Sequence, residues 1–271
     1  MSIGSRTQAN YWADPDLPTR YAAEPVQPSE PDRPFPLSGL PKLARETVFD
    51  RVYAALRRSL IEGALDAGEM LRIQDVAAQL GVSTMPVREA LGRLVSERAL
   101  EALPNRSIRV PLLTRARLRE IAHARTLVEG EAAALAAKRV EPETIAVLRR
   151  LSDAYDRLMT RPGTQVERAA ANHAFHFEIY RMAGSGVLLP IIESLWLQSG
   201  PVLRAAARLY DGTDGLGATH HHRQIVEALA RGEPEDARQA MGDDIRRAFD
   251  WVGDMIGEPD GGPGLLEPRS P

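Results

Sequence analysis

The 271-residue sequence contains no cysteine, so it can form no disulfide bond and offers no thiolate to a metal or a substrate. Aromatic residues are few, and no run of about 18 apolar residues is present, so we expect no transmembrane helix. The N-terminus lacks a basic stretch followed by an apolar one, which argues against a secretion signal. The remaining composition is that of a soluble globular protein, and we predict a cytoplasmic location with no membrane partner.

Two terminal segments differ from the rest in composition. Residues 1–44 hold many prolines and show no sustained hydrophobic period, and residues 257–271 are rich in glycine and proline. Such segments cannot bury enough apolar surface to fold alone, so both are predicted to be disordered tails.

Residues 73–95, IQDVAAQLGVSTMPVREALGRLV, contain two short amphipathic segments. Apolar residues of the first follow the spacing of one helical face: Ile73, Val76, Ala77 and Leu80. Gly81 can take a positive φ at a helix end, and Ser83 then stands at the N-cap position of the second helix. Val87, Ala90 and Leu94 give that helix its apolar face, which turns Thr84 and Arg88 outward. The pattern is typical of a helix-turn-helix, although an ordinary αα-hairpin shares it.

The flanking segments favour a DNA-binding domain over a bare hairpin. A helix is predicted over residues 46–62, and residues on both sides of Pro104-Asn105 alternate as in a two-stranded hairpin, with Arg106 and Arg109 beside the turn. Residues 42–115 carry 12 basic and 9 acidic side chains, a weak excess of the sign that DNA binding needs. This order of elements predicts a winged helix-turn-helix over residues 45–112.

The same stretch resembles the GntR family of bacterial transcription regulators. The resemblance covers residues 46–111 and rests on RRSLIEGALDAGEML, VAAQLGVSTMPVREALGRL and ALPNRSIRV. In this family the start of the recognition helix and the tip of the wing contact double-stranded operator DNA. The resemblance therefore implies a set of candidate DNA-contacting residues, to which we add one at the start of the preceding helix: Ser83, Thr84, Arg88, Arg106 and Gln74.

The sequence departs from the family pattern at two places. The family commonly has Arg-Thr where Thr84-Met85 stand, and glycine where Ser107 stands. Loss of that arginine removes a bidentate guanine contact, so a different operator sequence is expected. Arg88 has an alternative role as an ion-pair partner of nearby Glu89 or Asp75.

Residues 113–256 are predicted to form an all-helical domain, which makes the fold class mainly α. Short breaks at glycine and proline imply an antiparallel bundle. We expect six helices and no strand: 114–139, 142–160, 164–183, 187–210, 216–231 and 234–254.

Several polar residues of this domain lie on helical stripes that should face its core. They are Arg125, Asn172, His176, His222 and Asp244, whereas His220 and His221 are rotated away from the core stripe. Burying a polar group without a partner is costly, so we expect the inward ones to meet. Two histidine nitrogens, one carboxylate oxygen and one amide oxygen can hold a divalent ion such as Zn, Ni or Mn. Arg125 beside the ion would bind a carboxylate effector.

Each of these residues also has a simpler explanation. A single core histidine is more often only hydrogen-bonded, and Asn172 could cap a backbone group. Arg125 could pair with Glu129 four residues later.

The helical part resembles the FCD effector domain of FadR-like GntR regulators. The matching segments are RTLVE at 125–129, NHAFH at 172–176, HRQIVEALARG at 222–232 and AMGDDI at 240–245. Many members hold a divalent metal with Asp-x-x-x-His and two further histidines, with a small carboxylate beside it. Here Asn172 replaces the aspartate and Asp244 replaces the last histidine, which implies a metal site of altered affinity that includes His176 and His222. Six helices imply the shorter, VanR-like form.

These features predict a transcription regulator, acting as a repressor and binding a pseudo-palindromic operator as a homodimer. A small carboxylate would change operator affinity by binding one arrangement of the dimer better than another. No separate general base stands beside the candidate ligands, so an enzyme is not expected. Two alternatives are a DNA-binding dimer with a purely structural helical domain, and a metal-dependent enzyme, which would leave the winged helix unexplained.

Overall fold

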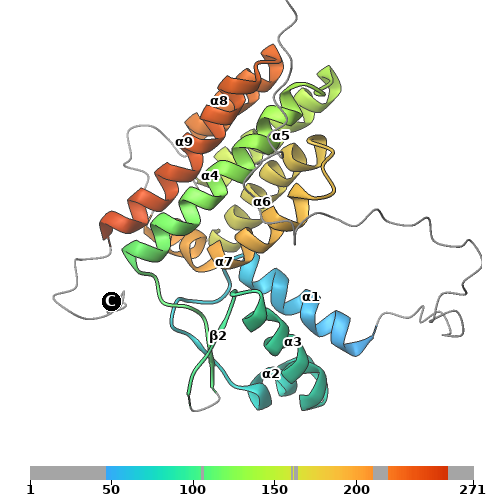
Figure 1. Ribbon diagram of the computed structural model, residues 1–271, viewed down its shortest axis with the longest axis vertical. Coiled ribbons are helices and arrows are strands. Elements are labelled where there is room, and N and C mark those ends of the chain that lie inside the picture. Colours follow the sequence, from blue (N-terminus) through green and yellow to red (C-terminus); the bar gives the residue numbers. More distant parts are fainter. Residues whose placement is uncertain (1–46, 105–106, 160, 162–163, 210–218, 256–271) are drawn as a thin grey trace, which may run out of the picture. The chain divides into compact units, whose positions relative to one another are not determined.

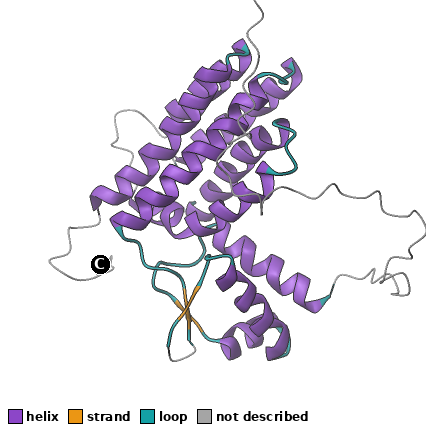
Figure 2. Ribbon diagram, viewed as in Figure 1, coloured by secondary structure: helices purple, strands orange, loops and turns teal. Residues whose placement is uncertain are grey.

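The computed structural model describes residues 47–104, 107–159, 161, 164–209 and 219–255. Both predicted tails and the predicted wing residue Arg106 lie outside these ranges. The described part is mainly helical (Figure 2), as predicted, with one small sheet. Within it, no helix combines the length and the apolar character that crossing a membrane requires.

The N-terminal part of the described chain holds three helices and three short strands (Figure 1). In chain order these are α1 (Val48–Ile61), β1 (Met70–Leu71), α2 (Ile73–Leu80), α3 (Thr84–Ser96), β2 (Glu101–Ala102) and β3 (Ile108–Arg109). Their apolar residues form one core, which includes Val52, Leu56, Leu60 and Leu91 together with the predicted stripe residues Val76, Ala77, Val87, Ala90 and Leu94.

The ends of these helices follow from local chemistry. α1 begins with a capping box, in which Thr47 and Asp50 satisfy each other's backbone N–H groups. Gly81 ends α2 at φ 64°, the left-handed conformation that glycine adopts without steric cost. Ser83 stands at the N-cap of α3, as predicted, but its hydroxyl makes no capping hydrogen bond there. The Ser83 side chain therefore keeps its hydrogen-bonding groups for another partner.

The predicted hairpin gains a third strand. β1 and β2 both pair antiparallel with β3, which gives the order β1-β3-β2. The sequence patterns predict no strand in the segment that contains β1. A strand of two residues is too short to show a period of two, so the sequence carries no signal for it.

The C-terminal part consists, within the described residues, of the six predicted helices, each ending within one helical turn of its predicted limits. They are α4 (Arg115–Ala137), α5 (Pro142–Met159), α6 (Gln165–Met182), α7 (Leu188–Leu209), α8 (Thr219–Arg231) and α9 (Pro234–Met255). The boundary predicted between residues 112 and 113 falls in the segment between β3 and α4.

α4 is the central helix of this part and packs against α6, α7, α8 and α9. Figure 1 shows α4 and α9 side by side along most of their length. Its alanines at 132, 133, 134, 136 and 137 are all buried, and their small side chains let neighbouring helices approach closely. The same core buries polar side chains, among them Arg125, Glu129, His176 and His222. Such residues need partners inside the protein.

α7 contacts both cores. Leu197 is buried in the core of the N-terminal part, and a Cβ atom on Gly200 would lie 1.9 Å from the carbonyl oxygen of Leu60 in α1. Arg204 bonds the Asp66 carboxylate through Nε at 2.5 Å and Nη2 at 3.2 Å, and its Nη1 bonds the Gly63 carbonyl at 2.7 Å. The helix continues through Pro201, which has no N–H to donate. α7 therefore links the winged part to the helical part directly.

Candidate functional site

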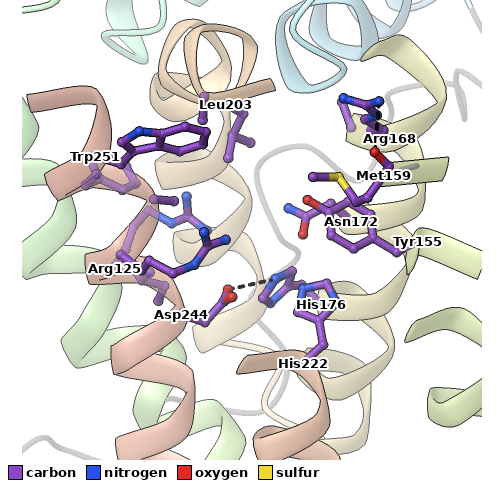
Figure 3. A pocket seen from close by; sticks show the side chains of 16 residues that line it. Arg125, Tyr155, Met159, Arg168, Asn172, His176, Leu203, His222, Asp244 and Trp251 are labelled. Atoms are coloured by element: carbon purple, nitrogen blue, oxygen red, sulfur yellow. Dashed lines mark hydrogen bonds and ion pairs between the residues drawn. The ribbon is translucent and has the colours of Figure 1, made fainter. Parts of the chain in front are cut away.

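A cavity of about 70 Å³ lies among the helices of the C-terminal part, and the four predicted ligands and Arg125 all line it. Figure 3 shows Arg125 and Asp244 on one side and Asn172 and His176 on the other. At roughly 10–15 Å³ of such volume for each water molecule, the cavity holds about five waters or one small organic ion. The stripes of four helices, α4, α6, α8 and α9, thus converge as predicted.

Three of the predicted ligands are close enough to bind one ion. His176 Nε2 lies 3.3 Å from Asp244 Oδ2, and the ligand atoms of His176, His222 and Asp244 all lie within 4.8 Å of one another. Ligand atoms about 2.1 Å from a common metal are separated by roughly 3–4 Å, so a small adjustment brings this set to bonding distance. The residues present fit a divalent cation.

His222 is buried at 1% exposure and packs against the rings of Phe175 and Tyr155, at centroid distances of 4.0 and 4.9 Å. Its Nδ1 has no hydrogen-bond partner among the described residues. Burial, together with the charges of His176 and Arg247, lowers the pKa of His222 to about 3. The imidazole is therefore neutral at pH 7, which is the form that binds metals.

The neighbouring histidines behave differently. His220 is exposed, as expected, but His221 is half-buried, so the expectation of an exposed His221 is only partly met. Side chains of consecutive helical residues point about 100° apart. His221 therefore lies at the edge of the face that His222 buries, and His220 lies farther from it.

Asp244 supplies the negative charge of the set. Burial opposes its ionisation, but the hydrogen bond from His176 and the nearby positive charges outweigh burial and hold the pKa of Asp244 below its usual range. One carboxylate oxygen beside two imidazole nitrogens gives a donor set that attracts a divalent cation. Asn172 lies one turn before His176 on α6 and is half-buried in the cavity lining, where its amide oxygen is a fourth candidate donor.

Arg125 binds a carboxylate of the protein itself. Its Nε and Nη2 lie 2.6 and 3.0 Å from the two oxygens of Glu129, the alternative partner considered from the sequence. The guanidinium also lies over the ring of Trp196, at 4.5 Å from the centroid. Arg125 is 3% exposed and Glu129 is fully buried.

Glu129 also accepts hydrogen bonds from Tyr180, through its hydroxyl, and from Trp196, through Nε1 at 3.2 Å. Burial and the Glu129 charge raise the pKa of Tyr180 well above its usual value, so the phenol stays protonated. Neither of these partners of Glu129 is predicted by the sequence patterns. Tyr180 follows His176 by four residues on the same helical face, which is a usable signal, but nothing in the sequence connects Trp196 with Glu129.

Two further arginines line the cavity, Arg168 and Arg247. Arg168 donates to the backbone carbonyls of Leu158, Met159 and Arg161 at 3.0, 3.2 and 2.5 Å. Arg168 therefore caps the C-terminal end of α5, and its role is structural. Both charges still favour an anion in the cavity.

The candidate DNA-contacting residues form a second, separate group. Gln74, Ser83, Thr84 and Arg88 are all exposed. Arg88 makes no hydrogen bond or ion pair with any residue that the structure describes, so neither Asp75 nor Glu89 holds it. Such an arginine at the start of a recognition helix can contact a base or a phosphate.

In the wing, Arg109 and Glu101 pair across the strands, with Nε 2.7 Å from the carboxylate. Arg106 lies outside the described residues.

Comparison with known proteins identifies a family for each of the two parts of the chain. Residues 49–110 match the family described as bacterial regulatory proteins, gntR family, and residues 120–247 match the FCD domain. The chain is 30% identical over 208 residues to the HTH-type transcriptional regulator McbR of Escherichia coli, covering 76% of this chain and 92% of that one. It is 32% identical over 200 residues to a probable D-xylose utilization operon transcriptional repressor of Paenarthrobacter nicotinovorans, covering 74% and 86%.

The solved structure of E. coli McbR/YncC has a TM-score of 0.71 and 27% identity to this chain, covering 79% of this chain and all of that one. These relatives are transcriptional regulators rather than enzymes. The chain therefore belongs to the GntR family of bacterial transcriptional regulators, with an FCD domain after its helix-turn-helix domain.

Proposed function

We propose that this regulator represses transcription as a homodimer on a pseudo-palindromic operator, and that a small carboxylate bound beside a divalent cation changes its affinity for DNA. The observation that carries the proposal is the convergence of His176, His222 and Asp244 in one small cavity lined by arginines. The repressor assignment is supported by the name of the P. nicotinovorans relative.

Each residue of the cavity has a distinct part in this proposal. His176, His222 and Asp244 hold the cation, with the Asn172 amide oxygen as a fourth donor. The cation supplies positive charge to the effector carboxylate. Glu129 accepts from two of the five N–H donors of Arg125, so Arg125 can bind a carboxylate without releasing Glu129.

α7 offers a route from the cavity to the DNA-binding part. Leu203 and Ala206 of this helix line the cavity, and Arg204 between them bonds Asp66 and the Gly63 carbonyl at the end of α1. An effector that favours one position of α7 would therefore favour one placement of α1. Coupling of this kind requires different effector affinity for the two placements.

The metal and effector parts are tested together. We expect a divalent ion, measured by inductively coupled plasma mass spectrometry, to copurify with the protein. We also expect some members of a panel of small carboxylates to raise the melting temperature, and the increase should disappear after chelation. Absence of both would show that the helical domain is structural only.

The DNA-contacting role is tested at Arg88. Replacing Arg88 by alanine should weaken operator binding by about 1–3 kcal/mol, roughly 5- to 150-fold in Kd, because a base or phosphate contact is lost. The operator is obtained by selection from random DNA, and Kd is measured by fluorescence anisotropy.

The matched control is Arg93→Ala in the same helix. Its guanidinium bonds Glu97 at 3.1 Å and lies 4.2 Å from the centre of the Tyr53 ring, so its loss should barely change operator affinity. Both variants should keep the wild-type oligomeric state. Unchanged affinity in Arg88→Ala would remove Arg88 from the proposed interface.

A further inference from the structure

The two ring nitrogens of His176 face different partners. Nε2 lies 3.3 Å from Asp244 Oδ2, on the side of the cavity. Nδ1 lies 3.2 Å from the hydroxyl of Tyr180, which is one turn later on α6 and 1% exposed. A neutral imidazole carries its hydrogen on only one nitrogen, and only the other can bind a cation. The partners of the two nitrogens therefore compete for the ring hydrogen, and the partner of Nδ1 influences whether Nε2 is available.

Glu129 fixes the direction of the Tyr180 hydroxyl. Its two oxygens accept hydrogen bonds from Nε and Nη2 of Arg125, from Nε1 of Trp196 and from the hydroxyl of Tyr180. Arginine and tryptophan side chains can only donate, so Glu129 acts purely as an acceptor. A Tyr180 hydroxyl turned away from Glu129 would place two oxygen lone pairs against each other at hydrogen-bond distance. The single hydroxyl hydrogen therefore belongs to Glu129.

The remaining neighbours of the Tyr180 hydroxyl do not compete with Glu129 for its hydrogen. Met241 Sδ lies 3.6 Å from the Tyr180 hydroxyl and is a weak acceptor. With its hydrogen directed to Glu129, Tyr180 offers only a lone pair to His176. A lone pair accepts a hydrogen, so Tyr180 favours hydrogen on Nδ1 of His176, whereas the Asp244 carboxylate favours hydrogen on Nε2. A cation held by Asp244 and Nε2 removes the second preference, and the hydrogen on Nδ1 that Tyr180 accepts then matches the metal-binding form.

We propose that Tyr180 and Glu129 are positioning residues of the metal site, which hold His176 in the tautomer that presents Nε2 to the cation. The inference rests on the proposed function, since it assumes that His176 is a ligand. Without the Tyr180 hydroxyl, His176 would take the other tautomer and donate a hydrogen bond from Nε2 to Asp244. Neither His176 Nε2 nor Asp244 Oδ2 would then be available to the cation. Hydrogen-bond partners of this kind tune the affinity of a metal site through its ligands.

Tyr180→Phe tests the proposal, because it keeps the ring and its packing but removes the hydroxyl. We expect the full-length variant to bind Zn²⁺ about 10- to 100-fold more weakly than the wild type in competition with a chromophoric chelator. In the metal-free protein, ¹⁵N NMR of the histidine side chains should show His176 partly as the Nδ1–H tautomer, because the Tyr180 oxygen competes with Asp244 for the ring hydrogen. Tyr180→Phe should move it toward the Nε2–H tautomer.

Tyr53→Phe is the matched control. It removes another tyrosine–carboxylate hydrogen bond, to Glu97 at 2.7 and 2.8 Å in the DNA-binding part, and should leave both readouts unchanged. Unchanged Zn²⁺ affinity and tautomer in Tyr180→Phe would overturn the proposal, and so would a lower melting temperature without either change. A wild type that binds no Zn²⁺ but shows the Nδ1–H tautomer, lost in Tyr180→Phe, would refute the proposed metal site and leave the positioning role supported.

Discussion

Replacing Glu129 by leucine should lower the free energy of unfolding by about 3–5 kcal/mol, the usual cost of removing one partner of a buried ion pair. The variant leaves the guanidinium of Arg125 in a site of 3% exposure without its counter-charge. It also removes the acceptor of Trp196 Nε1 and of the Tyr180 hydroxyl. The loss is measured by urea denaturation followed by circular dichroism.

Glu131→Leu is the control for this variant. Glu131 lies on the same helix and pairs with Arg238 at 2.5 Å, but the two side chains are 45% and 37% exposed. An exposed pair contributes at most about 1 kcal/mol, so the control should be nearly neutral. The double variant Arg125→Met, Glu129→Leu should recover part of the lost stability, because neither charge of this pair is then left buried alone. Equal losses in Glu129→Leu and Glu131→Leu would contradict the role assigned to the buried pair.

Replacing His222 by alanine should abolish metal retention, weakening affinity by more than about 100-fold, since a ligand matters more than the groups that orient it. The carboxylate-dependent rise in melting temperature should disappear with it. His220→Ala, two residues earlier and exposed, should change neither property. Metal content after gel filtration and thermal shift provide the two measurements.

This comparison depends on which face of α8 points inward. If His220→Ala and His222→Ala behave alike, the assignment of His222 to the cavity is wrong. Loss of folding in His222→Ala is checked by circular dichroism, and His222→Gln fills much of the same space without a ring nitrogen. Retention of metal by a folded His222→Gln would remove His222 from the ligand set.

Most of the fold follows from spacing within the chain. The stripe Val87, Ala90, Leu94 of α3 and the glycine at 81 are local features, and the structure has them where the periodicity places them. The convergence of His176 and His222 could also be inferred, because polar groups on buried stripes need one another. These predictions rest on one helix at a time or on a general cost of burial.

Other features depend on packing that no local pattern encodes. β1 exists because Met70 and Leu71 meet Arg109 and Ile108 across the wing. The hydrogen bond from Trp196 to Glu129 joins positions 67 residues apart in the sequence. The half-burial of His221 likewise reflects which neighbouring helix covers that edge, which the sequence of α8 alone does not reveal.

The close approach at Gly200 limits how freely this protein can be recombined with its relatives. Any side chain at position 200 would collide with the carbonyl oxygen of Leu60. The backbones of α1 and α7 can therefore pack this closely only because position 200 is glycine. A biosensor that joins this helical domain to the DNA-binding domain of another protein must therefore keep the α1 surface of this protein. A cut near residue 112 separates the two halves of that fit.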